Sequence, residues 1–171
     1  MKIEWINHAS YVFQYKNSRI IADPWLFGSA FNDGWDLLVD TQFKVEDFKD
    51  ITHIWFSHEH PDHFAPQVLG KINEEVRKKI TILFQETADK RVVNFCKKLS
   101  FKVEELPHRS KFVIEDDFSI TCGKMVGIDS WLLYETSDFK LLNINDCVIS
   151  NRKLCESVKK TTGEVDVLMS Q

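Results

Sequence analysis

The 171-residue sequence has no apolar run long enough to span a bilayer, and its first residues lack the apolar core of a signal peptide. It also has no excess of basic residues, since 22 Lys and Arg stand against 26 Asp and Glu. The net charge of −4 argues against a surface built for nucleic acid. We therefore predict a cytoplasmic protein that neither inserts into membranes nor binds nucleic acid.

Cysteine is also scarce. The four cysteines include no C-x-x-C pair, so in a reducing compartment we expect free thiols that serve as small apolar residues. The alternative that Cys122 or Cys147 lies near a bound metal ion is left open. The composition, 43% hydrophobic and 28% charged, is that of an ordinary globular protein, and the length predicts a single domain over residues 1–171.

Histidine, by contrast, is concentrated in one short segment. Three of the six histidines, His58, His60 and His63, lie within six positions, with Asp62 between the last two. The segment directly follows the apolar run 51–56, which is the layout expected of a site at the end of a strand. Imidazole and carboxylate ligands suit zinc, and also iron or manganese when more oxygen ligands join. The alternative is an exposed, charged loop that happens to be rich in histidine.

The spacing of these residues predicts how they would share a metal. Side chains two apart on an extended backbone share a face, so a strand that turns at His58 places His58 and His60 on one side. Pro61 then kinks the chain and lets Asp62 and His63 approach from another direction. One loop can thus supply two ligands to each of two metals and leave positions open for water and substrate. Asp62 is also the candidate catalytic residue, since it could orient the nucleophilic water.

The pattern His58-x-His60-x-Asp62-His63 resembles the signature of the metallo-β-lactamase superfamily. The resemblance implies an α/β (α+β) fold, a four-layer αββα sandwich, and one or two divalent metal ions, with zinc favoured over iron or manganese. Superfamily domains usually run further, into a second half that contributes a last histidine ligand. We therefore predict a domain that is short or truncated in its second half, with exposed apolar surface that favours a homo-oligomer.

Two earlier stretches resemble one branch of that superfamily. Residues 7–10 and 20–25 are similar to the start of a branch that includes an ascorbate-6-phosphate lactonase and phospholipase-D-type enzymes. By analogy, Asp23 would lie beneath the metal loop and orient a ligand histidine through its second nitrogen. The alternative is a plain turn carboxylate before a proline. His8 either lines the site or is structural.

Apolar alternation predicts the remaining elements. Strands are expected at 2–6, 10–15, 19–22, 51–56, 80–84, 101–106, 111–114, 118–122, 131–134, 141–147 and 164–169, and helices at 65–79, 87–99 and 147–160. Residues 27–50 have no lasting period and are predicted to be a long excursion that could cover the site. Four aromatic residues in this excursion or just before it are candidate substrate contacts or, alternatively, pack on the core: Trp25, Phe27, Phe31 and Trp35.

A second group of ligands is expected beyond residue 130. The apolar strand that begins at Leu141 ends in Asp146, and the resemblance assigns to Asp146 the role of a carboxylate bridging two metals. The alternative is a carboxylate that caps the following helix. Most superfamily members have a further histidine before the 131–134 strand, but residues 123–130 contain none. His108 or Asp129 could substitute, and an oxygen-rich site would favour iron, manganese or magnesium.

Residues 129–133 and 142–147 together resemble a narrower branch, the catalytic domain of CMP-N-acetylneuraminate hydroxylase-like proteins. Members of that branch also carry a Rieske iron–sulfur domain, whose Cys and His pairs are absent from this sequence. The absence puts the hydroxylase activity in doubt and leaves the lactamase-like domain intact as an interpretation.

These observations predict a metal-dependent hydrolase in which metal-activated water attacks an ester, lactone, amide or phosphoester bond of a small polar substrate. Two alternatives remain open. One is a non-haem iron hydroxylase-like component that acts on a nucleotide-activated sugar. The other is a non-catalytic metal-binding or scaffold domain. The sequence does not name the substrate, because loops whose geometry cannot be derived from spacing shape the pocket.

Overall fold

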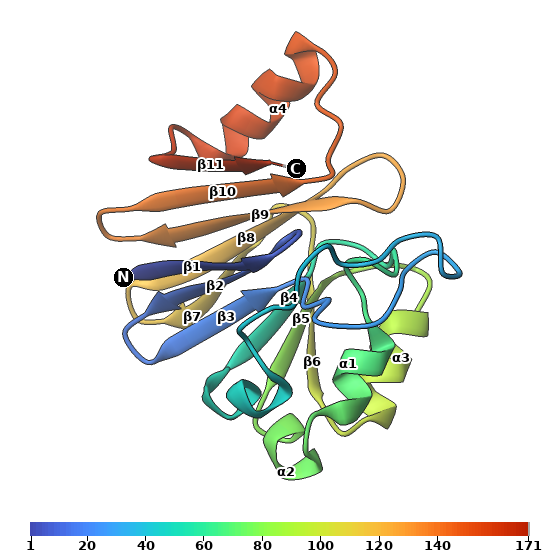
Figure 1. The fold of residues 1–171 in the computed structure, drawn as a ribbon. Helices are drawn as coiled ribbons and strands as arrows, with labels where there is room; N and C mark the ends of the chain where they lie inside the picture. Colours follow the sequence, from blue (N-terminus) through green and yellow to red (C-terminus); the bar gives the residue numbers. More distant parts are fainter. Residues whose placement is uncertain (171) are drawn as a thin grey trace. The chain divides into compact units, whose positions relative to one another are not determined.

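In the computed structural model, which describes residues 1–170, the chain divides into two compact units (Figure 1). Unit 1 comprises Met1–Glu105, and unit 2 begins at Leu106. Each unit is built on one mixed β-sheet with helices, which confirms the predicted α/β class. The prediction of one domain stays a prediction. No helix in the described part of the chain is long and apolar enough to cross a membrane.

The sheet of unit 1 has six strands in the order of the sequence. They are β1 (Lys2–Asn7), β2 (Ser10–Tyr15), β3 (Ser18–Ala22), β4 (His53–Phe56), β5 (Thr81–Gln85) and β6 (Lys102–Leu106). Turns of two residues, with positive φ at His8 and Lys16, join the first three strands, so these strands pair antiparallel. Long connections precede β4 and β5, and both strands pair parallel with their predecessors.

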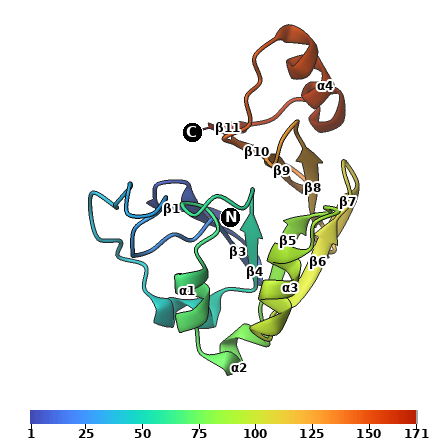
Figure 2. The ribbon, with the colours of Figure 1, turned by 90° about the vertical axis from the view of Figure 1, so that its right-hand side faces the viewer.

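Helices cover one face of this sheet. The helices of unit 1 are the 3₁₀ helix η1 (Val45–Asp50), α1 (Pro66–Lys71), α2 (Glu74–Arg77) and α3 (Arg91–Lys98). Figure 2 shows α1 and α3 beside β4, β5 and β6. Alternate side chains of the central strands, such as Ile54 and Ile82, form one apolar cluster with Leu69 of α1 and Val93 of α3. This cluster holds β4 rigid up to the residue where the histidine segment begins.

The helix predicted over residues 65–79 is two helices. Ile72 adopts an extended conformation after α1, and Asn73 then caps α2 by accepting a hydrogen bond from the Glu75 amide at 2.9 Å. The apolar period of the sequence continues through this break, but an asparagine that can accept from the backbone two residues on favours a new helix start.

The sheet of unit 2 has five strands in the order β11-β10-β9-β8-β7. They are β7 (Lys111–Glu115), β8 (Phe118–Lys124), β9 (Ser130–Thr136), β10 (Lys140–Asn145) and β11 (Val167–Ser170). Strands β7 to β10 form an antiparallel meander, and β11 joins β10 in parallel after a helical crossover. Gly123 of β8 lies so close to the Trp131 ring that a Cβ at this position would come within 1.9 Å of it.

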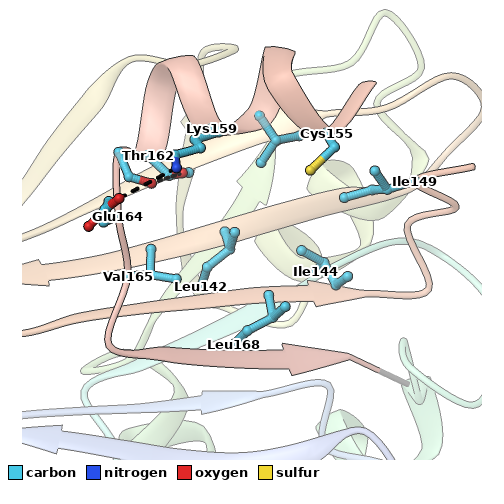
Figure 3. Close-up of a pocket in the computed structure, with 11 residues that line it drawn as sticks. Leu142, Ile144, Ile149, Cys155, Lys159, Thr162, Glu164, Val165 and Leu168 are labelled. Carbon is cyan, nitrogen blue, oxygen red and sulfur yellow. Dashed lines mark hydrogen bonds and ion pairs between the residues drawn. The ribbon is translucent and has the colours of Figure 1, made fainter. Parts of the chain in front are cut away.

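That crossover contains α4 (Arg152–Thr162), which begins later than the predicted 147–160 helix. Asn151 caps α4 by accepting from the Leu154 amide at 3.0 Å, so Asp146 does not cap this helix. Gly163, with φ of 69°, ends it. A cavity of about 370 Å³ lies between α4 and strands β10 and β11 (Figure 3).

Candidate metal centre

Strands β1, β3, β4 and β5 of unit 1 run in the same direction, so their carboxyl ends lie at the same end of the sheet. Strand β1 is antiparallel to β2, which is antiparallel to β3, and β4 is parallel to β3. His8 therefore follows the end of β1, Asp23 follows β3, and residues 57–63 follow β4, all at the same edge. The carboxyl ends of parallel strands are a common location for ligand sites, because the loops that leave them converge there.

The histidines of the 57–63 segment contact one another. His58 Nε2 lies 2.9 Å from His60 Nδ1, and the rings of His58 and His63 are 4.1 Å apart between centroids. His58 and His63 are fully buried, whereas His60 is exposed. The turn at Pro61 closes with the Phe64 amide donating to the His60 carbonyl at 2.7 Å. His58 and His60 therefore lie on the same side of the chain, while their role as metal ligands stays a prediction.

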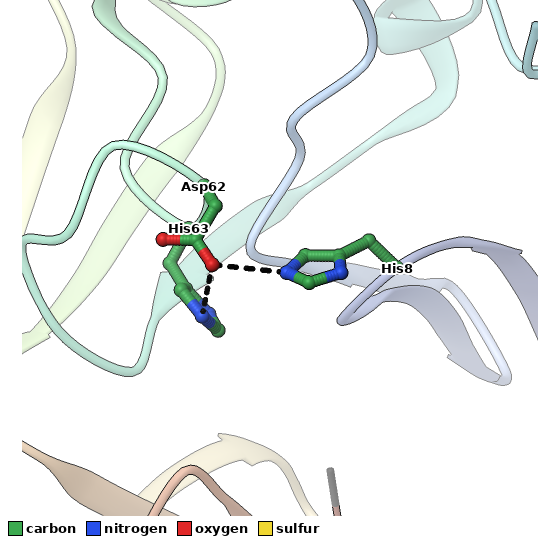
Figure 4. A group of neighbouring side chains, drawn as sticks. All are labelled: His8, Asp62 and His63. Carbon is green, nitrogen blue, oxygen red and sulfur yellow. Dashed lines mark hydrogen bonds and ion pairs between the residues drawn. The ribbon is translucent and has the colours of Figure 1, made fainter. Parts of the chain in front are cut away.

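Asp62 joins this group together with a histidine that the sequence left open. Its Oδ2 lies 3.3 Å from His63 Nε2 and 3.0 Å from His8 Nε2 (Figure 4). One ligand atom from each of His8, Asp62 and His63 lies within 4.8 Å of the other two. In the sequence, the only indication of a role for His8 was its position in a tight turn between two strands. A lone histidine in a turn has no neighbouring ligand at a characteristic spacing, so a metal-site residue cannot be told from a structural one.

Burial and hydrogen bonding act in opposite directions on the Asp62 carboxyl. Burial raises its pKa, but the neighbouring imidazoles of His63 and His8 outweigh burial and hold the pKa well below the usual aspartate value. Asp62 is therefore an ionised carboxylate at neutral pH.

Asp23 lies beneath the histidines and fixes their protonation. Its Oδ1 accepts from the Ser57 amide at 2.8 Å, and its Oδ2 accepts from the Ser57 hydroxyl at 2.7 Å and lies 3.1 Å from His63 Nδ1. A carboxylate only accepts, so His63 Nδ1 carries the proton and Nε2 carries the lone pair. The family resemblance predicted this position for Asp23, and its contacts with Ser57 and His63 are more than those of a plain turn carboxylate.

The same network sets the tautomer of His58. The Ser57 hydroxyl gives its one proton to Asp23, so it accepts from His58 Nδ1, which lies 2.9 Å from the Ser57 Oγ. The lone pair of His58 therefore sits on Nε2, the nitrogen that faces His60. Through one buried carboxylate, both buried histidines present the unprotonated nitrogen that a metal ligand requires.

The donor set fits a divalent cation. Two ligand atoms around a tetrahedral zinc lie about 3.3 Å apart, given bonds of about 2.0 to 2.1 Å. The separation of Asp62 Oδ2 from His63 Nε2, 3.3 Å, is close to that value. Asp62 Oδ1 is buried and has no hydrogen-bond partner among the described residues, which is costly for a carboxylate oxygen unless a cation compensates it.

The other predicted ligands lie in unit 2. Asp146 follows β10 in a tight turn, where its amide donates to the Asn145 side chain at 2.9 Å, and its bridging role stays a prediction. His108 Nδ1 accepts from the Lys124 amide at 2.9 Å, which gives His108 a structural role within unit 2. Asp129 directly precedes β9. These two residues remain alternatives for the missing ligand.

The cysteines are free thiols, as predicted. Burial raises the pKa of Cys96 and of Cys122 to about 12 and raises the pKa of Cys147 further. Burial thus favours the neutral thiol at these three positions.

The chain is an α/β protein in which imidazole and carboxylate groups that could hold a metal ion gather at the carboxyl ends of strands. Residues 2–170 match the family described as "Beta-lactamase superfamily domain", and the chain belongs to that family. Family membership implies divalent metal binding, and it confirms the metallo-β-lactamase-like fold that the sequence predicted.

Among characterised proteins, the chain is similar to cytidine monophosphate-N-acetylneuraminic acid hydroxylase of Xenopus laevis, with 27% identity over 163 residues. The match covers 88% of this chain but only 26% of the hydroxylase. A shorter match, 33% identical over 73 residues, covers 42% of this chain and 15% of the inactive human counterpart. The chain thus spans about a quarter of the length of the Xenopus relative.

Solved structures share the fold. Isothiocyanate hydrolase from Delia radicum gut bacteria superimposes with a TM-score of 0.72 at 18% identity, over 98% of this chain and 70% of that one. CmlA, a diiron β-hydroxylase from Streptomyces venezuelae, gives 0.72 at 16% identity, over 97% of this chain and 33% of that one. At these identities the likeness concerns the fold alone, and it includes both hydrolytic and oxidative enzymes.

Proposed function

We propose that the chain is the metal-binding part of a metal-dependent hydrolase that cleaves an ester, lactone, amide or phosphoester bond of a small molecule. The observation that carries the proposal is the Asp23 network. A buried carboxylate that gives two buried histidines the tautomer of a metal ligand has no comparable use in a plain surface loop.

His58, His60, Asp62 and His63 would hold the cation or cations, with Asp146 as the proposed bridging carboxylate. When bound, such a cation lowers the pKa of a water molecule and so supplies a nucleophile at neutral pH. Zinc is the proposed metal because imidazole nitrogens dominate the ligands of unit 1, and iron or manganese would require more oxygen ligands.

His8 would act as a positioning residue. A hydrogen bond from its Nε2 to Asp62 Oδ2 leaves the second carboxylate oxygen available to a cation or a water. Asp62 is the proposed catalytic residue, because an ionised carboxylate beside a cation can accept a hydrogen bond from the attacking water and orient it.

The test is metal analysis combined with hydrolysis assays. Protein stripped with a chelator and reloaded with zinc, manganese or iron is assayed on ester, lactone and phosphodiester substrates. His60→Ala is expected to lower both the metal content and the hydrolysis. His53→Ala is the matched control, because His53 lies at the start of β4, at the opposite end of this strand from the histidine segment 57–63.

The outcome of the His60→Ala substitution separates this proposal from a scaffold role. Unchanged metal content and unchanged thermal stability in His60→Ala would favour a non-catalytic domain over the hydrolase.

A second candidate, an iron-dependent hydroxylase component, is favoured by the similarity to the Xenopus hydroxylase. It predicts iron as the bound metal and oxygen consumption when an electron-donating protein is supplied. Hydrolysis that persists with zinc in the absence of oxygen would argue against it, because zinc has no redox chemistry.

A further inference from the structure

The excursion between β3 and β4 forms an apolar pocket beside the metal centre. A cavity of about 520 Å³ within unit 1 is lined by Trp5, Trp25, Trp35 and three aliphatic residues at positions 37–39, together with His8. Trp5 and Trp35 are 67% and 54% exposed, and Leu38 is fully exposed. Large apolar side chains left open to water in one hollow mark a binding surface rather than a core.

Aromatic contacts join this pocket to the candidate ligands. The His8 ring lies edge-on to Trp25 at 5.5 Å and to Trp35 at 6.5 Å between centroids. Trp35 contacts Phe31 at 5.0 Å, and Phe31 lies 5.8 Å from the His60 ring. The excursion therefore borders the imidazole group on two sides. Of its predicted substrate contacts, Trp25 and Trp35 line the pocket, and Phe31 connects it to His60.

The charge of the lining restricts what can bind. Asp36 lines the pocket and is exposed, while the described lining residues include no lysine or arginine. A phosphate or carboxylate group in this hollow would face the Asp36 carboxylate and tryptophan rings, whose faces are negative. It would lack the arginine or lysine partners that normally pair with such anions. A neutral or cationic aromatic group meets no such penalty.

We infer that this pocket binds an uncharged or cationic apolar group of the substrate, preferably aromatic, and presents the adjoining bond to the His8, Asp62 and His63 cluster. This inference deepens the proposed function and rests on it. It selects an aromatic or aliphatic ester, lactone or amide over an anionic nucleotide-activated sugar as the substrate class.

The test uses two nitroaromatic probes that quench tryptophan emission and differ by one anionic group. Chelator-treated protein is titrated with 4-nitrobenzyl alcohol and with 4-nitrobenzyl phosphate, and CMP serves as a nucleotide competitor. The alcohol is expected to quench saturably, with an affinity at least about fivefold above that of the phosphate, and CMP is expected not to displace it. Because no metal is present, the result is independent of the hydrolase assays.

Two variants and one control locate the binding. Trp35→Ala should lower the affinity for 4-nitrobenzyl alcohol about tenfold, since it removes one aromatic wall of the pocket. Asp36→Asn should reduce the difference in affinity between the alcohol and the phosphate, because it removes the negative charge that faces the phosphate. Val126→Ala, an exposed apolar truncation in unit 2, should change neither affinity.

Three results would overturn the inference. They are non-saturable quenching by the alcohol, equal affinity of wild type and Trp35→Ala for it, and binding of the phosphate or CMP at least as tight as that of the alcohol. A protein that binds the alcohol saturably, but takes up no metal on reloading and hydrolyses no substrate, would contradict the proposed function and leave the pocket assignment standing.

Discussion

Replacing Asp23 by Asn should impair metal binding while the protein stays folded. Asn tolerates the positive φ of 41° at this position and has nearly the volume of Asp. The Ser57 amide can only donate, so the Asn oxygen must face it, and the Asn amino group then faces the Ser57 hydroxyl and His63 Nδ1. His63 Nδ1 must now accept, so its proton moves to Nε2, the ligand nitrogen.

The same substitution reverses the tautomer of His58. The Ser57 hydroxyl, no longer donating to a carboxylate, donates to His58 Nδ1, and the proton of His58 also moves to Nε2. Loss of an outer hydrogen-bond partner of a ligand typically lowers metal affinity by about 10- to 100-fold, or about 1.4 to 2.8 kcal/mol. Because two ligands are affected, we expect the upper end of that range.

Zinc affinity is measured by competition with a chromophoric chelator, and ¹⁵N chemical shifts of the imidazoles in metal-free protein report the tautomers. Asp47→Asn is the matched control, since Asp47 accepts a backbone hydrogen bond from the Lys44 amide in the first turn of η1, away from the histidine segment in the sequence. A folded Asp23→Asn protein with wild-type zinc affinity and unchanged imidazole shifts would refute the tautomer argument.

Four further predictions concern the site and unit 2. Saturating zinc should raise the midpoint of thermal unfolding, by about 2.7 kcal/mol of stability at 100 times the Kd, and a chelator should reverse the rise. His8→Phe should weaken zinc binding about tenfold in the same competition assay, because it removes the hydrogen bond to Asp62; unchanged affinity would exclude a positioning role. Glu135→Gln should lower the free energy of unfolding by about 0.5 to 1 kcal/mol at pH 7, since ion pairs with Lys111 at 2.6 Å and Lys140 at 2.9 Å lower the pKa of Glu135. This stability is present above the unfolded-state pKa and is lost as the pH falls through the folded-state pKa. Urea unfolding curves of variant and wild type should therefore converge in acid. Gly123→Ala should destabilise by about 3 kcal/mol because its Cβ would overlap Trp131, whereas Gly70→Ala, which meets no atom within 4 Å, should not; comparable unfolding curves for the two would contradict the packing.

Much of the site could be predicted because its residues are local in sequence. His58, His60, Asp62 and His63 occupy six positions, and strand geometry alone places the first two on one side. Asp23 was reached through its position at a strand end and the family resemblance. Both inferences needed no knowledge of how distant segments pack.

The parts that could not be predicted depend on packing between distant segments. His8 reaches Asp62 only because β1 ends at the same edge as β4, and no spacing in the sequence encodes that meeting. The break after α1 and the late start of α4 depend on Asn73 and Asn151, whose capping bonds override an apolar period that continues through them. Helix propensity and the period of apolar residues predict helix ends poorly where a single side chain can terminate or start a helix.

The parallel pairing of β3 and β4 separates two tasks that many enzymes perform with the same loop. The proposed metal ligands of unit 1 follow strand ends whose spacing the sheet dictates, whereas most of the tryptophan-lined hollow belongs to the connection between those strands. That connection can lengthen, shorten or change its aromatic residues without altering the distance between Asp23 and Ser57. A family built in this way can acquire new substrates by rewriting one connecting segment, while the chemistry beneath it is inherited intact.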